Sequence, residues 1–209
     1  ELKTLYAAKL ADAAALRDPA TGWLARNDCD GMIWAGQYAA ATSVVGVDIG
    51  AAEYPERSGR FSRRPFPACW TPEGGDHGSK TTWSRDMFVG GLLPYAWYNG
   101  NRDVLERHAA YGRDHNWQMG EPLADGRAVY TPALIGLLYK SIEALGGDYN
   151  VNSAWPDVYP PGLTDYEAHL QAMSILLHGE VAAKLTDAAL ALDISNTMFE
   201  RIVGHAERE

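Results

Sequence analysis

The chain has 209 residues, of which 46% are hydrophobic and 22% charged, a composition typical of a globular protein rather than a disordered one. Its formal net charge of −9 disfavours a polyanionic partner, so we expect no binding to nucleic acid. The longest nearly uncharged run, residues 87–100, is shorter than the roughly 20 residues of a membrane-spanning helix, so we also expect no membrane span. The length favours one domain over residues 1–209.

Two contrasting helices are expected before residue 44. Residues 2–17 place apolar side chains at helical spacing and end before Asp18-Pro19, which predicts an amphipathic helix on the outside. Residues 31–43 carry no charge, so they predict a helix that is apolar on every side and lies inside. A long irregular segment, residues 44–83, follows. Such segments are usually functional or disordered, and residues 44–49 are a candidate short strand within it.

Apolar and amphipathic helices alternate again after this segment. Ser84 is a typical N-cap for an apolar helix over residues 87–97, in which Pro94 predicts a kink. Residues 102–119 mix charged and apolar side chains behind Asn101, which predicts an amphipathic helix that faces out.

The last part of the chain continues the pattern. Thr131-Pro132 is a strong start for a third apolar helix, which Gly146-Gly147 ends. Two amphipathic helices are expected over residues 164–177 and 186–205. Because helices that are apolar all round need a second layer around them, the sequence predicts an all-α fold of two-layer helical hairpins, a partial (α/α) toroid.

Carboxylates cluster in the segments that lead into the apolar helices. Asp28 and Asp30 precede the first, Asp86 opens the second and Glu121 precedes the third. Glycoside hydrolysis needs two carboxyl groups beside the scissile bond, one acid and one base or nucleophile. Two structural alternatives stay open: Asp86 as a carboxylate stabilised by the helix N-terminus, and Asp28 and Asp30 as turn or N-cap residues.

A second chemistry uses the cationic side chains of the irregular segment. His77, Lys80 and Arg85 would neutralise a uronate carboxylate and abstract the adjacent proton, as a polysaccharide lyase requires. The structural alternative is that Lys80 and Arg85 pair with Asp76 and Asp86 at the surface.

Aromatic residues supply candidate sugar-stacking platforms, because flat rings with a polar edge suit partly polar ligands. The candidates are Trp34, Trp83, Trp97 and Trp117, although rings within inner helices more often pack in the core. A non-catalytic carbohydrate-binding or structural module would need these rings but not the carboxylates.

Several familiar sites are missing from the sequence. It contains no phosphate-binding loop, no nucleophile elbow and no dinucleotide fingerprint, and its histidines lack the spacing of a zinc hydrolase. An EF-hand is rejected because Arg26 and Gln37 would occupy ligand positions. A weaker cation site at Asp28 and Asp30 stays open, but we expect no metal ion or other cofactor. Whether Cys29 and Cys69 are paired also stays open.

The motifs Asp28-Cys29-Asp30-Gly31 and Trp83-Ser84-Arg85-Asp86-Met87, each before an apolar helix, resemble those of the six-hairpin glycosidases and related α/α-toroid sugar-active enzymes. The resemblance covers about residues 20–145. In that family the acids lie on loops that enter inner helices, so the resemblance implies a catalytic pair of Asp86 with Asp30 or Asp28. Because the chain has fewer helices than a complete barrel, three alternatives stay open: a reduced toroid, a toroid that a second copy or a partner chain completes, or a different helical fold. The function expected is cleavage of glycosidic bonds in a poly- or oligosaccharide.

Overall fold

The structure, a computed structural model, describes residues 2–24, 30–42, 47–65, 83–121, 128–147 and the separate positions 180, 181, 183 and 184. The chain divides into two compact units, residues 1–130 and 131–209. In the described ranges all regular structure is helical, and extended residues pair only as isolated bridges. The all-α prediction is therefore confirmed, and the packing of these helices can be described unit by unit.

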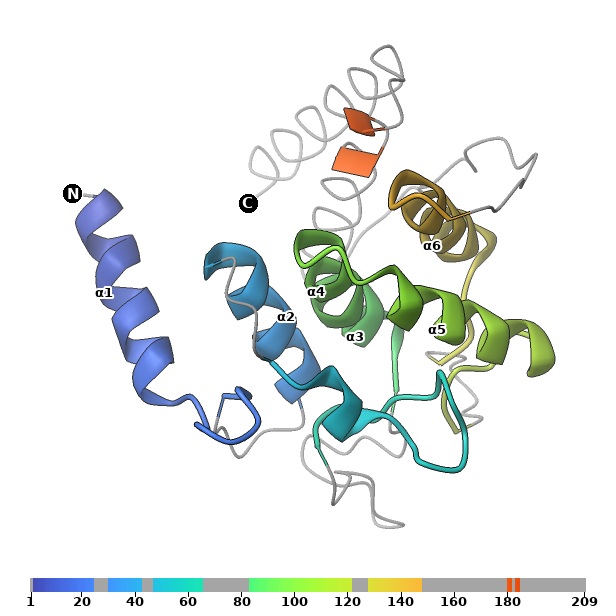
Figure 1. Ribbon diagram of the computed structural model, residues 1–209, viewed down its shortest axis with the longest axis horizontal. Helices are drawn as coiled ribbons and strands as arrows, with labels where there is room; N and C mark the ends of the chain where they lie inside the picture. The colour runs from blue at the N-terminus through green and yellow to red at the C-terminus, as the bar shows by residue number, and fades with distance from the viewer. Residues whose placement is uncertain are drawn as a thin grey trace, which may run out of the picture. The chain divides into compact units, whose positions relative to one another are not determined.

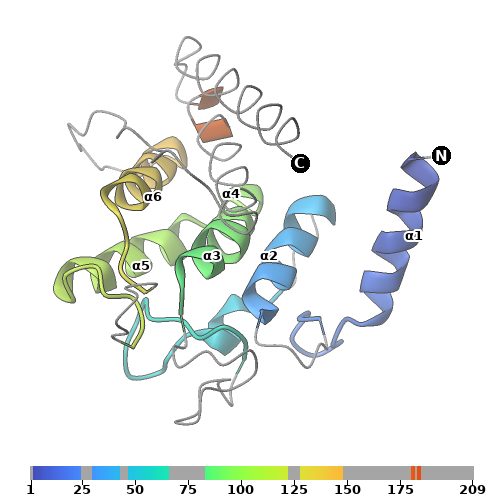
Figure 2. The same ribbon diagram turned by 180° about the vertical axis from the view of Figure 1, so that it is seen from behind.

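The first unit holds most of the described helices. They are α1 (Leu2–Ala15), α2 (Gly31–Thr42), the 3₁₀ turn η1 (Ile49–Ala52), α3 (Arg85–Met87), the π-helical turn η3 (Phe88–Leu92), α4 (Leu93–Tyr98) and α5 (Arg102–Asp114). The continuous stretch from α3 through η3 to α4 packs along α2, and α5 packs against α4 (Figures 1 and 2). No described helix is long and apolar enough to cross a membrane.

The contrast between outer and inner helices is confirmed. The described side chains of α1 are exposed, apart from the half-buried Ala13, whereas none of those on α2 is exposed. Met32 and Ala35 of α2 are completely buried. The absence of charge in residues 31–43 therefore identified an interior helix correctly, because no side chain there carries a charge that burial would deprive of water.

Two glycines allow α2 and η3 to approach closely. A Cβ atom at Gly36 would lie 2.0 Å from the carbonyl oxygen of Gly91, and one at Gly91 would lie 2.4 Å from that of Met32. Both distances are impossible for a side chain, so the two backbones touch where only hydrogen atoms fit between them. This contact fixes the position of α2 relative to η3.

The π-helical turn η3 lies between α3 and α4, just before Pro94. The amide of Leu93 donates to the carbonyl oxygen of Phe88, five residues back, in place of the four of an α-helix. In a regular α-helix the proline ring would clash with the carbonyl of Gly90, and the wider π turn relieves that clash. The expected disturbance at Pro94 is thus a π turn, and Phe88, Leu92 and Leu93 remain fully buried.

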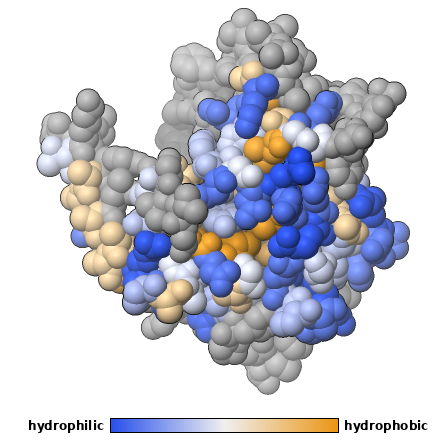
Figure 3. All heavy atoms as spheres, in the orientation of Figure 1, coloured by the Kyte–Doolittle hydropathy of each residue, from blue (hydrophilic) through white to orange (hydrophobic). Residues whose placement is uncertain are grey.

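Helix α5 is amphipathic as expected, but it ends earlier. Val104, Leu105 and His108 are buried, while hydrophilic side chains face outward from this helix (Figure 3). The helix stops at Asp114 rather than at residue 119, because Asn116 and Trp117 have φ angles of 51° and 62°. These left-handed conformations end the helix.

In the second unit, the described helix is α6 (Pro132–Ala144). Thr131 caps its N-terminus and accepts a hydrogen bond from the amide of Leu134. At its other end the amides of Gly146 and Gly147 donate to Glu143 and Ile142, both at 2.9 Å, which is the Schellman arrangement. The start and stop signals read from the sequence are both confirmed. The helices expected over 164–177 and 186–205 lie outside the described residues.

Candidate functional site

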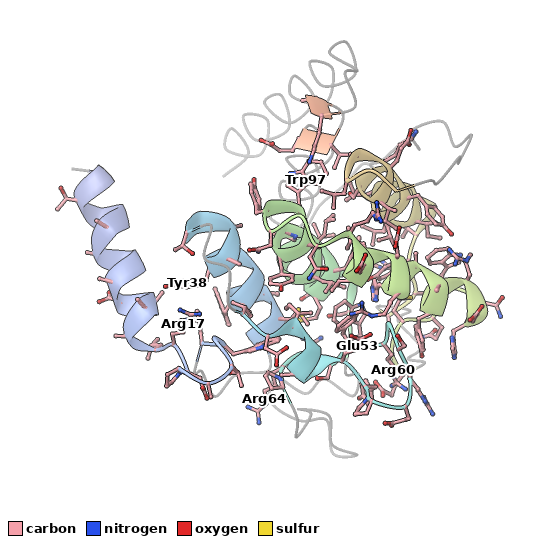
Figure 4. The ribbon with its side chains drawn as sticks, in the orientation of Figure 1. Arg17, Tyr38, Glu53, Arg60, Arg64 and Trp97 are labelled. Atoms are coloured by element: carbon pink, nitrogen blue, oxygen red, sulfur yellow. The ribbon has the colours of Figure 1, made fainter. Side chains whose placement is uncertain are left out.

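The loop that follows η1 is held in a compact shape by Glu53 (Figure 4). Its carboxylate accepts hydrogen bonds from the amide of Gly59 at 2.7 Å and from Nε and Nη2 of Arg107 at 2.9 and 2.8 Å. Burial alone would raise the pKa of Glu53, but the hydrogen bonds from Arg107 and Gly59 outweigh it and lower the pKa. The loop is thereby tied to α5.

A short strand was expected over residues 44–49. The described part of this range is irregular at residues 47 and 48, and η1 begins at Ile49.

Arg63 connects the end of this loop to the start of α2 through its backbone. Its carbonyl oxygen accepts a hydrogen bond from the amide of Met32 at 2.6 Å. A Cβ at Gly31 would lie 2.9 Å from the Cβ of Arg64, so the glycine allows the two chain segments to touch. The first turn of α2 therefore gains a backbone acceptor that its own helix cannot supply.

The Arg63 side chain joins the two predicted catalytic carboxylates. Its Nη1 donates to Oδ1 of Asp30 at 3.1 Å, and its Nη2 donates to Oγ of Ser84 at 2.8 Å. The Ser84 hydroxyl in turn donates to Oδ1 of Asp86. We call these four residues the Arg63 junction. It brings together carboxylates that precede or open two different helices.

The four members differ in exposure. The side chain of Arg63 is 8% exposed and that of Asp30 is 34% exposed, whereas Asp86 as a residue is only 7% exposed. Ser84 occupies the N-cap position as predicted, but its hydroxyl makes no capping bond to the helix. The hydroxyl is used within the junction instead. Of the four residues, Asp30 is the most accessible to solvent.

A second polar cluster, around His108, is closed to solvent. Nδ1 of His108 lies 2.7 Å from the carbonyl oxygen of Gly59, and Nε2 lies 2.7 Å from the hydroxyl of Tyr130. Nε1 of Trp83 donates to the same hydroxyl at 2.9 Å. Because the carbonyl oxygen of Gly59 can only accept a hydrogen bond, Nδ1 carries the proton and Nε2 accepts from the hydroxyl of Tyr130. We call these four residues the His108 network.

The environment of the His108 network suppresses ionisation. Burial lowers the pKa of His108 to about 4, against smaller opposing effects of Gly59 and Glu53. Burial likewise raises the pKa of Tyr130 well above 10, with a smaller contribution in the same direction from the charge of Asp86. The network is therefore neutral at pH 7 and surrounded by rings, with Trp83 edge-on to His108 at 5.2 Å between centroids.

The aromatic candidates have three different placements. Trp83 is completely buried and Trp97 is 8% exposed, so the structure places both in the core rather than on a surface where a sugar could stack. Trp34 is half-buried on α2. Trp117 is also half-buried, and a Cβ at Gly112 would lie 2.4 Å from its ring, so the ring rests directly on α5. Trp117 thus keeps a partly exposed ring on a rigid support.

The remaining polar candidates make contacts of their own. Glu121 forms an ion pair with Arg60, whose guanidinium lies 4.6 Å from the ring centre of Tyr54. Arg85 donates from Nε to the carbonyl oxygen of Val129 at 2.8 Å. Both side chains therefore hold neighbouring segments together, in addition to any part that they take in binding.

Other predicted residues lie outside the described ranges. They are Asp28, His77, Lys80, Cys29 and Cys69. The structure thus leaves the lyase residues His77 and Lys80 and the cation site at Asp28 without a test. Within the described ranges, no group of three or more His, Cys, Asp or Glu side chains is arranged to hold a metal ion.

Arg63, His108 and Tyr130 were not among the functional residues predicted from the sequence. A signal for Arg63 was present, because four arginines fall between residues 57 and 64 in a chain otherwise poor in basic clusters. His108 lies at an inward position of the amphipathic helix, where a polar side chain needs a buried partner. The partners themselves are distant in the sequence.

Comparison with known protein families, curated proteins and solved structures finds no match to this chain. Its function is therefore inferred from the geometry of the site.

Proposed function

We propose that the protein is a hydrolase that cleaves glycosidic bonds in a poly- or oligosaccharide, with Asp30 and Asp86 as its carboxyl pair. The observation that carries the proposal is the Arg63 junction. One guanidinium contacts Asp30 and, through Ser84, holds Asp86. Carboxylates from two separate segments thus meet in one site, as glycoside hydrolysis requires.

Their surroundings favour different roles for the two carboxyl groups. Asp30 is in direct contact with a cation and is one-third exposed, and a neighbouring positive charge favours the ionised form of a carboxyl group. Asp30 is therefore the base or nucleophile. Asp86 takes the remaining role, that of the general acid, and the hydrogen bond from the hydroxyl of Ser84 holds it in place.

Binding of the sugar would use the partly exposed ring of Trp117 and the polar groups of Glu121. A ring that is supported on one side by α5 loses little freedom when it stacks on a ligand, which favours binding. In the proposed architecture the inner helices α2 and α3–α4 belong to a partial (α/α) toroid, completed by a second copy or a partner chain. Their packing against each other supports this arrangement.

The test is a screen of the purified protein against a panel of poly- and oligosaccharides, with reducing ends and ultraviolet absorbance measured together. We expect new reducing ends from the wild type and a loss of about 100-fold or more in both Asp30→Asn and Asp86→Asn. Circular dichroism should show that both variants remain folded. Asp48→Asn, which changes an exposed carboxylate outside the junction, should keep full activity.

Other outcomes would support other functions. An unsaturated product that absorbs in the ultraviolet, together with full activity in both Asp variants, would replace the hydrolase with the lyase based on His77. Binding of glycan without cleavage, weakened by Trp117→Ala but not by Asp30→Asn, would indicate a binding module.

A further inference from the structure

We infer that Arg63 is the positioning residue of the proposed site: it fixes Asp30 and Asp86 relative to each other and keeps Asp30 ionised. This inference rests on the proposed function. Its structural basis is that one residue bonds to two helices by different means. The carbonyl of Arg63 receives the amide of Met32 in the first turn of α2, and its guanidinium reaches Ser84 at the start of α3.

The shape of the guanidinium suits this task. Its two terminal nitrogens point along diverging directions in one plane, so Asp30 and Ser84 are each held by a separate nitrogen. A lysine would offer one compact ammonium group on a flexible stem, which does not impose a fixed geometry on two acceptors. The distance between the two carboxyl groups therefore depends on a rigid planar group.

Burial makes the arrangement stiff. The Arg63 side chain is 8% exposed, and a charge with so little access to water stays in place only while its partners compensate it. Movement of the guanidinium away from Asp30 or Ser84 would lose part of that compensation. The junction therefore holds its geometry before substrate arrives, which is what catalysis by a carboxyl pair needs.

The charge of Arg63 has a separate consequence for Asp30. A cation next to a carboxylate opposes its protonation. A neutral side chain at position 63 would allow Asp30 to take up a proton at higher pH, and the base or nucleophile would then be lost. The role of Arg63 can therefore be detected in the pH profile, where a residue that merely stabilises the fold has no effect.

The experiment compares wild type, Arg63→Lys and Arg63→Gln on the oligosaccharide that the screen identifies. For Arg63→Gln we expect kcat to fall about 100-fold with little change in KM, since misplacement by about 1 Å can cost this much. The acidic limb of its kcat profile should move up by about half a pH unit. Arg63→Lys should restore the position of that limb but only part of kcat.

Two further variants complete the design. Arg107→Gln removes an arginine–carboxylate contact outside the junction, that with Glu53, and should lower thermal stability without changing the pH profile. Ser84→Ala cuts the link to Asp86 and keeps the Asp30 contact, so kcat should fall while the acidic limb stays in place. Ser84→Ala also tests the inference if the Arg63 variants do not fold.

The possible failures can be told apart. If the wild type cleaves no oligosaccharide in the panel, the proposed function and this inference both fall. If the wild type is active and Arg63→Gln keeps its kcat and pH profile, the inference alone falls. The inference also falls alone if the Arg63 variants do not fold and Ser84→Ala has the kcat of wild type.

Discussion

The Arg63 junction and the His108 network are built from adjacent pieces of chain, yet their chemistry differs. Gly59 and Arg63 belong to one loop, and Trp83 and Ser84 are neighbours in the sequence. In the His108 network every group is neutral and enclosed by aromatic rings such as Phe61 and Phe88. The junction contains the ion pair of Arg63 with Asp30, and Asp30 reaches solvent.

This difference separates a structural role from a functional one. A buried network whose donors and acceptors all match stabilises one conformation and offers nothing to a ligand. A network that ends in an accessible carboxylate keeps a reactive group in a fixed position. We therefore expect substitutions in the His108 network to lower stability, and substitutions in the junction to lower activity.

The largest expected loss of stability follows His108→Ala. The substitution leaves a cavity among the rings, and the carbonyl oxygen of Gly59 and the hydroxyl of Tyr130 each lose their hydrogen bond with His108. The free energy of unfolding should therefore fall by about 3–5 kcal/mol. Denaturant unfolding measures it. His115→Ala, which changes an exposed histidine just beyond α5, should cost less than about 1 kcal/mol. Equal losses in both variants would contradict a structural role for the His108 network.

A smaller effect is expected from acidification. The pKa of His108 is about 4 in the folded protein and about 6.5 in an unfolded chain. The unfolded state therefore binds the extra proton first as the pH falls. The contribution of His108 is fully present above pH 6.5 and is lost between about 6.5 and 4, for a total of about 3 kcal/mol.

Unfolding measured across this pH range checks the prediction. A His108→Gln variant has no titrating group at this position, so it should lose less stability than the wild type between pH 7 and 4. An identical pH dependence in the two proteins would place the acid sensitivity elsewhere.

The smallest effect on stability is expected from Asp30→Asn. Asparagine keeps a side-chain oxygen that can accept a hydrogen bond from the buried Arg63, and Asp30 itself is one-third exposed, so the loss should be about 0–1 kcal/mol. The variant should unfold within about 1 kcal/mol of the wild type while hydrolysis is lost. A stability loss as large as that of His108→Ala, with activity retained in the folded fraction, would make the junction a structural feature.

Local patterns in the sequence predicted the helices well. An uncharged run identified α2 as an interior helix, and the pair Thr131-Pro132 marked the start of α6. These signals succeed because capping and burial act on residues that are neighbours along the chain. The early end of α5 was missed, since the left-handed conformations of Asn116 and Trp117 depend on the packing of the Trp117 ring against the helix.

The candidate site was predicted less completely. Asp30 and Asp86 could be selected because each lies at the start of an apolar helix. Arg63 could not be connected with them, because its partners Asp30 and Ser84 lie 33 and 21 residues away in the sequence. The burial of Trp83 is likewise determined by Tyr130 and His108, which no local pattern associates with it.

The long-range bonds of Arg63 also determine when the site exists. The junction forms only after the loop that ends at Arg63 has closed onto the first turn of α2 and onto Ser84 at the start of α3. The amide of Met32, which donates to the Arg63 carbonyl, should therefore exchange with deuterium only when this closure is broken. Its exchange rate would report the fraction of molecules whose carboxylates are aligned.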